Sequence, residues 1–216
     1  MRKAAISFAA GINFVLSARW LLVGALLILC VNAQAADAPT LQAPTWMIGD
    51  TWTYQTPSGA QIVYTVLGAG NSGYTVRARL GNTPTGTLLV HPNLSTDKGY
   101  FIQIDWPLAS GRSWGADQTE QANDETSTIK WHTTWLVKSW ESVAVPAGTF
   151  DAYHVDGKQC AAIAARPCGN FSFWYAPTVK SFVKESWASE NYWGRLAGRM
   201  EQLVSYTLHN PGPNGP

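Results

Sequence analysis

Hydrophobic residues along most of this chain recur at every second position, which is the spacing of β-strands rather than of helices. The clearest stretch is 129–137, where the odd positions carry Ile, Trp, Thr, Trp and Val. The even positions carry Lys, His and Thr, with Leu136 as the exception. An antiparallel strand with one buried and one solvated face has this pattern. We therefore expect antiparallel sheet to dominate the fold.

The same reading predicts about eleven short strands and no helix of ordinary length. They are expected at 51–55, 62–66, 74–80, 87–90, 99–105, 129–137, 142–145, 150–156, 171–175, 181–187 and 200–208. Glycine-rich 68–73 predicts a hairpin loop, and 188–199 has room for a helical turn or two at most. The fold class expected is all-β, mainly antiparallel: a meander whose sheet curls into a half-barrel or open barrel.

Two polar segments are expected to be solvated, mobile backbone. The first is 115–127, which is acidic and contains neither Lys nor Arg. The second is the tail 209–216, which is rich in Pro, Gly and Asn. Together with the strands they suggest a single β domain at 46–208 after a linker at 36–45.

The first 35 residues have the features of a secretory signal peptide. Basic residues, the last of them Arg19, precede an apolar run of twelve residues that ends at Val31, before the small-x-small site at Ala33 and Ala35. A spanning helix needs about 20 apolar residues, so cleavage after Ala35 is favoured. The long leader keeps an uncleaved anchor open as the alternative. Leu29 is too bulky to precede a lipidated Cys30, which argues against a lipid anchor.

Cleavage changes the formal net charge from +1 to −2, because it removes three basic residues and no acidic one. Nucleic acid is therefore an unfavourable partner. The remaining 181 residues suit one domain with a real core. The expected location is the periplasm or the exterior of a bacterial cell, with no transmembrane anchor after cleavage.

Only two cysteines remain after cleavage, Cys160 and Cys168. Oxidising compartments let disulfides persist, so we expect the two to pair and to close a loop of about nine residues. Two unpaired buried thiols are the alternative. A catalytic redox pair requires closer spacing and a helix start to lower a thiol pKa, and the sequence has neither.

Ten tryptophans remain in the mature chain, and most are expected in the core. Two strands carry aromatic residues on both faces: Trp174 alternates with Phe171, Phe173 and Tyr175, and Trp187 is expected opposite Phe182. One face of a half-barrel forms its core, and the other can receive an apolar ligand. Coverage by a loop or by the C-terminal segment explains the pattern equally well. The candidate ligand-binding residues are Trp131, Trp135, Trp174, Tyr175 and Trp187.

Catalytic and metal-binding patterns are weak. Gly111–Gly115 matches the Gly-x-Ser-x-Gly nucleophile elbow, which would make Ser113 a nucleophile, but no helix pattern follows it. His154 and Asp156 share a strand face, where a solvated pair is favoured over a weak metal site. The acids of 117–125 lack the skeleton of a calcium loop, and no nucleotide-binding loop is present. We expect no catalytic residue, no metal and no cofactor.

Four segments together resemble the TapB-like exported bacterial proteins, relatives of a domain-of-unknown-function family. They are Trp46-Met-Ile-Gly-Asp-Thr-Trp-Thr-Tyr54, Pro107-Leu-Ala-Ser-Gly-Arg-Ser-Trp114, Val145-Pro-Ala-Gly-Thr-Phe-Asp-Ala-Tyr153 and Phe173-Trp-Tyr-Ala-Pro-Thr-Val-Lys-Ser-Phe-Val-Lys184. The resemblance spans Trp46 to about Tyr206. It implies an antiparallel β fold similar to the lipoprotein-carrier half-barrels and a bacterial envelope location, and it supplies no catalytic residues.

Three functional hypotheses follow from these observations. The leading one is a non-enzymatic envelope protein that binds a lipid-like ligand, another apolar small molecule or a hydrophobic segment of an envelope protein. The second is a glycan-binding module that uses exposed Trp and Tyr as stacking platforms. The third, more remote, is a serine hydrolase centred on Ser113.

Overall fold

The computed structural model describes residues 38–96, 102–121, 128–162, 168–190 and 196–210. The signal peptide expected at 1–35 lies outside these ranges, and so does the part of the tail after 210. Residues 36–216 form one compact unit by their internal contacts.

In the described ranges of this unit, ten strands pair antiparallel in a single sheet. They are β1 (Thr51–Gln55), β2 (Gln61–Gly70), β3 (Gly73–Leu80), β4 (Thr83–Val90), β5 (Ser113–Gln121), β6 (Thr128–Val145), β7 (Gly148–Ala161), β8 (Gly169–Ala176), β9 (Ser181–Glu190) and β10 (Leu196–Thr207). Their order across the sheet is β4-β3-β2-β1-β10-β9-β8-β7-β6-β5. β4 and β5 are the two edges, so the sheet is open. The all-β prediction is confirmed, and the described residues contain no helix.

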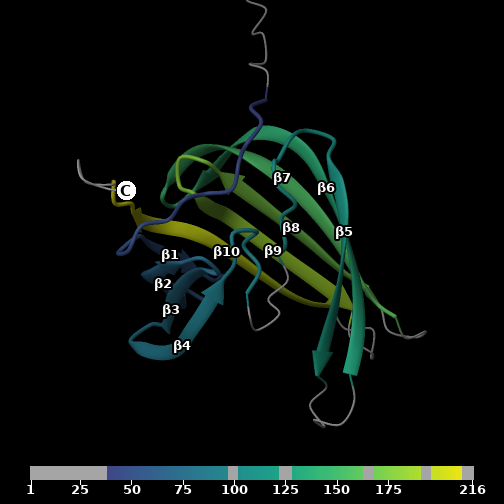
Figure 1. The fold of residues 1–216 in the computed structure, drawn as a ribbon, viewed down its shortest axis with the longest axis horizontal. Coiled ribbons are helices and arrows are strands. Elements are labelled where there is room, and N and C mark those ends of the chain that lie inside the picture. Colours follow the sequence, from purple (N-terminus) through teal and green to yellow (C-terminus); the bar gives the residue numbers. More distant parts are fainter. Residues whose placement is uncertain (1–37, 97–101, 122–127, 163–167, 191–195, 211–216) are drawn as a thin grey trace, which may run out of the picture. The chain divides into compact units, whose positions relative to one another are not determined.

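The sheet curls strongly, as Figure 1 shows. One hydrophobic core contains residues of β1 to β4 near one edge together with residues of β6 to β9 from the other half. Strands so far apart in a flat sheet share a core only when the sheet bends around it. The inner, concave face therefore holds the core, and the outer, convex face is solvated.

Alternation along β6 sets which side chains reach that core. Ile129, Thr133, Trp135 and Val137 are buried while the even-numbered residues between them are exposed, as the sequence predicts. Lys138 is an extra residue in the pairing with β7, because Val137 pairs with Val155 and the next pair is Ser139 with His154. Such a bulge bends a strand and reverses its faces beyond that point.

A close contact between β6 and β7 fixes their separation. Trp135 pairs directly with Gly157, and its ring lies against the glycine. A Cβ atom added to Gly157 would come within 2.1 Å of Trp135 Cζ3. Only glycine allows this approach, so the pair defines the inner surface of the sheet there.

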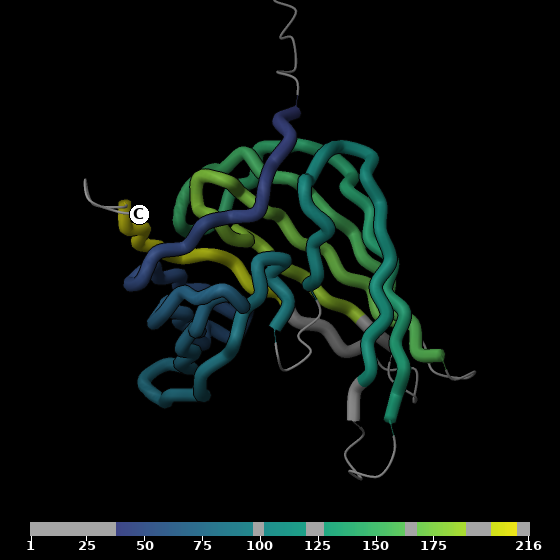
Figure 2. Tube along the Cα trace, in the orientation of Figure 1, coloured from purple at the N-terminus to yellow at the C-terminus, as the bar shows by residue number. Residues whose placement is uncertain are grey.

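The segments outside the strands also lie against the sheet, as the tube in Figure 2 shows for the chain before β1. Leu41 pairs with Leu108, and the Tyr153 hydroxyl donates a hydrogen bond to the Pro39 carbonyl at 2.7 Å. Trp106 packs edge-on against Tyr175 with ring centroids 5.2 Å apart. The residues expected to be a linker thus contact the core through these bonds.

The predicted disulfide between Cys160 and Cys168 is present. It joins the end of β7 to the start of β8, next to the pair formed by Gln159 and Gly169. The two strands are therefore connected covalently at the base of the loop that joins them.

Several predicted boundaries are wrong. The strand expected at 142–145 is the end of β6, and 102–105 is not a strand, whereas 99–101 lies outside the described residues. The segment 115–121, expected as a loop, belongs to β5, because pairing with β6 satisfies its polar backbone. The described parts of 188–199 are strand, and most of 68–73 continues β2 and β3. His209 is not a free tail, because its N–H donates to Asp50.

Candidate functional site

A cavity of about 590 Å³ lies on the concave side of the sheet. One wall comes from β1 to β4 and the other from β8, β9 and β10. Its aliphatic lining is contributed mainly by Ile62, Val76, Ala78, Leu80, Leu88 and Val90. Its aromatic lining consists of Trp46, Trp52, Tyr54, Tyr64, Phe171, Phe173, Phe182 and Trp187. The volume falls in the usual range for small-molecule sites.

Strand alternation builds the aliphatic wall. Val76 and Ala78 lie two residues apart on β3, so both side chains point to the same face. Leu88 pairs with Val76 on the neighbouring strand, and Tyr64 pairs with Ala78 on the other side. The three strands thus present one continuous apolar surface to the cavity.

A bulge in β9 sets the aromatic wall. Trp174 pairs with Lys184 and Tyr175 pairs with Phe182, which leaves Val183 as an extra residue. Phe182 and Trp187 consequently line the same cavity. The prediction that they lie on opposite faces is wrong, because strict alternation does not allow for the extra residue.

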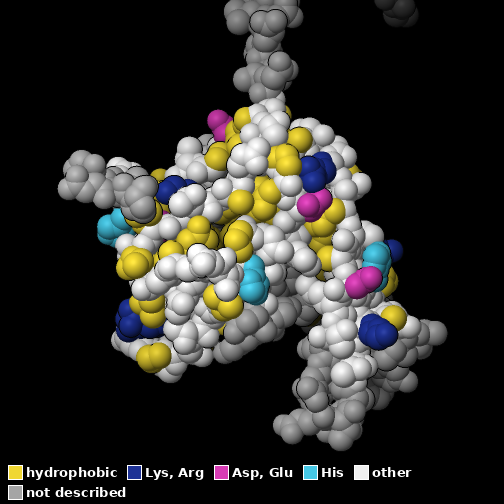
Figure 3. All heavy atoms as spheres, in the orientation of Figure 1, with side chains coloured by type: hydrophobic (Ala, Val, Ile, Leu, Met, Phe, Trp, Pro, Cys, Tyr) yellow, Lys and Arg dark blue, Asp and Glu magenta, His cyan; other side chains and the backbone are white. Residues whose placement is uncertain are grey.

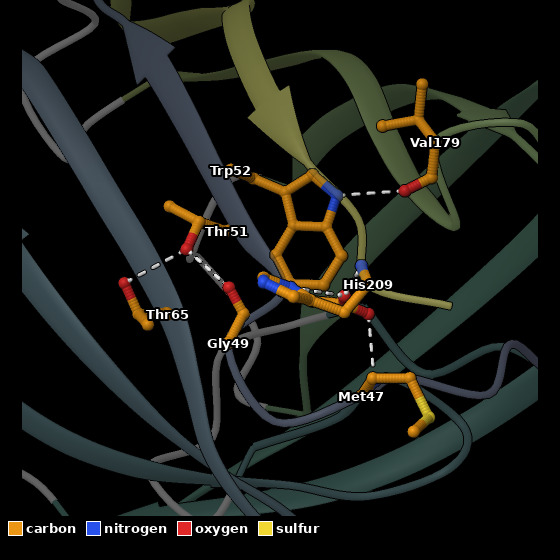
Figure 4. A network of polar contacts seen from close by, with 8 residues as sticks. Met47, Gly49, Thr51, Trp52, Thr65, Val179 and His209 are labelled. Carbon is orange, nitrogen blue, oxygen red and sulfur yellow. Dashed lines mark hydrogen bonds and ion pairs between the residues drawn. The ribbon is translucent and has the colours of Figure 1, made fainter. Parts of the chain in front are cut away.

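Three side chains hold the two walls together across the sheet's curl. The indole Nε1 of Trp46 donates to the Lys180 carbonyl at 2.7 Å, and that of Trp52 donates to the Val179 carbonyl at 2.9 Å (Figure 4). The Tyr54 hydroxyl donates to the Phe182 carbonyl at 2.8 Å. All three acceptors lie in or beside the turn between β8 and β9. These three hydrogen bonds therefore connect the two walls of the cavity.

The buried carboxylate of Asp50 connects the segment before β1 to the residues after β10. Its carboxylate accepts hydrogen bonds from the Met47 N–H at 2.8 Å and from the His209 N–H at 2.6 Å, and its side chain is 0% exposed. Gly49 has a φ of +95°, and a Cβ there would come within 2.9 Å of the His209 ring. The chain end after β10 is thereby tied to the start of β1.

Two acidic side chains lie in the lining of the cavity. Glu185 and Glu201 pair across β9 and β10, and Glu201 is 3% exposed. Burial raises the pKa of the Tyr54 hydroxyl well above its usual value, and the negative charge of Glu185 raises it further. Tyr54 therefore stays neutral and serves as a hydrogen-bond donor.

The segment after β4 closes part of the cavity. Leu94, Thr96 and Ile102 line it. The Ile104 N–H donates to the Asn93 carbonyl at 2.8 Å, and the Trp106 indole donates to the Pro92 carbonyl at 3.0 Å. These bonds hold residues 104–106 next to residues 92–93.

The convex face carries a different aromatic arrangement. The Trp174 ring lies between two neighbours: the His154 ring stacks on it at 4.4 Å, and Lys184 Nζ lies 4.5 Å from its centroid. Its indole Nε1 donates to Glu141 Oε1 at 2.7 Å. Hydrogen bonds from Ser139 and Trp174 lower the pKa of Glu141. Neighbouring side chains thus occupy both faces of this tryptophan.

The structure places the five predicted ligand-binding residues in different environments. Trp187 lines the cavity. Trp135 and Tyr175 are each 2% exposed and pack in the core, and Trp131 is half-buried on β6. Trp174 lies on the opposite face. That these residues bind a ligand stays a prediction.

The residues considered for catalysis and metal binding do not come together as a site. Ser113 begins β5, and a strand follows it where a nucleophile elbow requires a helix. His154 Nε2 lies 2.9 Å from Asp156 Oδ1 and His154 Nδ1 lies 3.8 Å from Glu141 Oε1. Among the described residues no group of three or more His, Cys, Asp or Glu side chains is arranged to hold a metal ion.

The aliphatic wall was missed by the sequence interpretation, which concentrated on aromatic residues. Its signal was nevertheless present, since the alternation at 74–80 places Val76 and Ala78 on one face. Nothing in the local pattern indicates that this face lies across a cavity from β8 and β9. That relation depends on the curl of the whole sheet.

Comparisons with known proteins give few similarities. No protein-family model and no curated protein matches the chain. The resemblance to TapB-like proteins accordingly stays a prediction.

In the ranges that the structure describes, no helix is long and apolar enough to cross a membrane.

Solved structures similar to the chain include three bacterial proteins. A protein assigned as exported, with a YmcC-like fold, from Bacteroides fragilis is 17% identical with a TM-score of 0.43, over 78% of this chain and 100% of that one. A protein assigned as a lipoprotein from Parabacteroides distasonis is 14% identical with a TM-score of 0.42, over 79% and 100%. The hypothetical lipoprotein YmcC from Escherichia coli is 10% identical with a TM-score of 0.42, over 74% and 85%. Scores and identities this low carry no argument about function.

Proposed function

We propose that this protein is a non-enzymatic binding protein of the bacterial cell envelope, whose cavity holds the apolar part of a lipid-like molecule. The cavity carries the proposal. Its walls are mainly aliphatic and aromatic, its volume is about 590 Å³, and side-chain hydrogen bonds from Trp46, Trp52 and Tyr54 brace it. A concave apolar site of this size is the usual form of a small-molecule pocket.

The envelope location is supported by two observations. The disulfide between Cys160 and Cys168 suits an oxidising compartment, and the first 35 residues have the features of a signal peptide. Sequencing the N-terminus of the protein isolated from cells checks this: a start at Ala36 in a periplasmic extract supports the proposal, and an intact N-terminus in the cytoplasm contradicts it.

An apolar ligand fits the lining better than a glycan does. Sugar-binding platforms are exposed aromatic faces, and in the described ranges the exposed large hydrophobic side chains include no tryptophan and one tyrosine, Tyr206. On the face shown in Figure 3, hydrophobic side chains are frequent in the middle and charged ones are scattered. Burying a lipid chain releases about 0.8 kcal/mol per methylene group, which is enough for firm binding without many polar contacts.

A pair of leucine substitutions tests the cavity directly. Leu80 lines it and is 47% exposed, so Leu80→Trp places a large ring in the cavity with little risk to folding. Leu136 is 40% exposed and lies on the convex face of β6, so Leu136→Trp is the matched control. We expect Leu80→Trp to weaken binding of a naphthylamine fluorescent probe by about tenfold.

The control should bind the probe as the unsubstituted protein does. Absence of probe binding to the delipidated, unsubstituted protein would contradict the proposed function. Equal effects of the two substitutions would place the binding site elsewhere.

A further inference from the structure

Among the residues that the structure describes, four buried polar atoms on the concave face of β5, β6 and β7 have no hydrogen-bond partner. They are Gln118 Oε1, Thr133 Oγ1, Trp135 Nε1 and Gln159 Nε2. Thr133 is 1% exposed, Trp135 is 2% exposed and Gln159 is 5% exposed. We refer to these four side chains as the inner polar patch.

Strand pairing brings the four side chains together. Thr133 pairs directly with Gln159 on β7. Gln118 on β5 pairs with Trp131, which places it diagonally next to Thr133, and Trp135 follows two residues further along β6. Directly paired side chains lie about 5 Å apart and diagonal ones about 7–8 Å apart. Thr133 and Gln159 lie at the centre of the patch, and Gln118 and Trp135 lie on either side of them, four positions or about 13 Å apart along β6. A head group with several polar groups is therefore needed to contact all four.

Unpartnered buried polar groups are costly, at about 1–3 kcal/mol each, and natural proteins contain few of them. Four of them on three neighbouring strands point to a partner beyond the described residues. Their chemistry specifies that partner. The Trp135 indole can only donate a hydrogen bond, and the Thr133 hydroxyl can both donate and accept. The two glutamine amides together offer one acceptor, Gln118 Oε1, and one donor, Gln159 Nε2. Rotating both amides by 180° exchanges these two roles.

A charged head group fits this set poorly. A carboxylate only accepts hydrogen bonds and leaves an acceptor such as Gln118 Oε1 unsatisfied, whereas an ammonium only donates and leaves the Trp135 N–H unsatisfied. A neutral group with hydroxyls or an amide both donates and accepts. None of the four residues of the patch carries a charge. The patch is therefore complementary to a neutral polar group.

Aromatic rings connect the patch to the cavity. Trp135 contacts Phe171 with ring centroids 6.0 Å apart, and Phe171 contacts Trp187 at 6.3 Å. Phe171 and Trp187 both line the cavity. From β6 to β8 is two strand spacings, or about 10 Å. None of the four patch residues lines the cavity, so a ligand that fills the cavity reaches the patch by displacing the rings of Phe171 and Trp135 that lie between them.

We infer that the inner polar patch is the head-group site of the ligand, and that the ligand is an amphiphile with a neutral head that carries hydroxyl or amide groups. This inference rests on the proposed function, because the apolar body of the ligand occupies the cavity. It adds that the protein selects neutral-headed amphiphiles over fatty acids and alkylamines.

Three probes of equal chain length test the selection: monolaurin, laurate and dodecylamine. In displacement of the naphthylamine probe from the delipidated protein, we expect monolaurin to bind about tenfold more tightly than the other two, which corresponds to about 1.4 kcal/mol. Thr133→Val keeps the shape of the side chain and removes its hydroxyl, so the preference should fall to about twofold while laurate affinity stays unchanged.

Thr134→Val is the matched control, because Thr134 is the exposed neighbour on the opposite face of β6. It should leave the preference intact. Gln118→Met, on the edge strand β5, provides a second variant in case the first does not fold, and it should also reduce the preference.

The outcomes separate this inference from the proposed function. Equal binding of the three probes, or a preference that survives both Thr133→Val and Gln118→Met, overturns the head-group site and means that ordered water alone satisfies the patch. Failure of all three probes to bind overturns the proposed function itself.

Discussion

The two faces of the sheet use the same residue type for different purposes, as Trp187 on β9 and Trp174 on β8 show. Trp187 points to the concave side and lines a cavity beside Phe171. Trp174 points to the convex side, where His154 and Lys184 cover its ring and Glu141 accepts its N–H. The Trp187 ring on the concave side borders a space that a ligand can fill, whereas neighbouring side chains already contact the Trp174 ring on the convex side.

This difference explains why tryptophan content alone is a poor guide to a binding site. A tryptophan with a complete set of neighbours contributes to stability, and one that borders a cavity is available to a ligand. Substitutions on the two faces should therefore affect different measurements.

The largest effect on stability is expected at the contact between β6 and β7. In Gly157→Ala the new Cβ meets the Trp135 ring at 2.1 Å, so the ring has to move out of a packed core. We expect the free energy of unfolding to fall by about 2–3 kcal/mol, as measured by chemical denaturation.

Gly115→Ala on neighbouring β5 is the control. Its nearest contact is the His132 ring at 3.4 Å, at the edge of ordinary van der Waals distance. Alanine suits a strand interior better than glycine, so this variant should be neutral or slightly stabilising. Equal destabilisation by both variants would show that the close contact with Trp135 is not the cause.

The two tryptophans should separate binding from stability. Trp174→Leu removes a stacked ring and a cation–π contact, and we expect a loss of about 1–2 kcal/mol of stability with unchanged probe affinity. Trp187→Leu removes part of the cavity wall, and we expect about tenfold weaker probe binding with a smaller change in stability. Fluorescence titration and thermal unfolding of both variants measure this. The reverse result would exchange the roles of the two faces.

The smallest effect concerns pH and the convex face. Hydrogen bonds from Ser139 and Trp174 lower the pKa of Glu141 from 4.5. A lowered pKa in the folded state means that the carboxylate stabilises the protein above its unfolded-state pKa, and that this contribution disappears as the pH falls through the folded-state pKa. Solvent exposure keeps the contribution small.

Comparison with Glu141→Gln checks this pH dependence. The unsubstituted protein should melt at a higher temperature than the variant at pH 7, and the difference should shrink as the pH falls below about 4. A difference that stays constant between pH 7 and pH 3 would rule out the carboxylate's charge as its source.

Local patterns in the sequence predicted most of the fold. The alternation of 129–137 gave the correct buried face of β6, and the range 51–55 matched β1. Where prediction failed, an extra residue or a distant partner was the cause. The bulge at Val183 brings Trp187 to the same face as Phe182, and pairing with β6 converts polar 115–121 into a strand.

The candidate site was harder to predict than the fold. Trp187 was identified because aromatic residues are conspicuous, but the aliphatic wall around Val76 and Leu88 looked like ordinary core. The four atoms of the inner polar patch come from three strands, and their lack of partners is a property of the folded chain. Sequence alone gives the faces of strands, whereas the curl of the sheet determines which faces meet.

Photo-crosslinking with a diazirine-labelled fatty acyl ligand is the most direct test of the central claim, that the concave face alone binds the apolar ligand. After irradiation and proteolysis, mass spectrometry locates the labelled residues. We predict labels on cavity-lining residues such as Val76, Leu88 and Phe182, and none at Leu136 or Trp174 on the convex face. Labels concentrated on the convex face, or spread equally over both, would contradict the account.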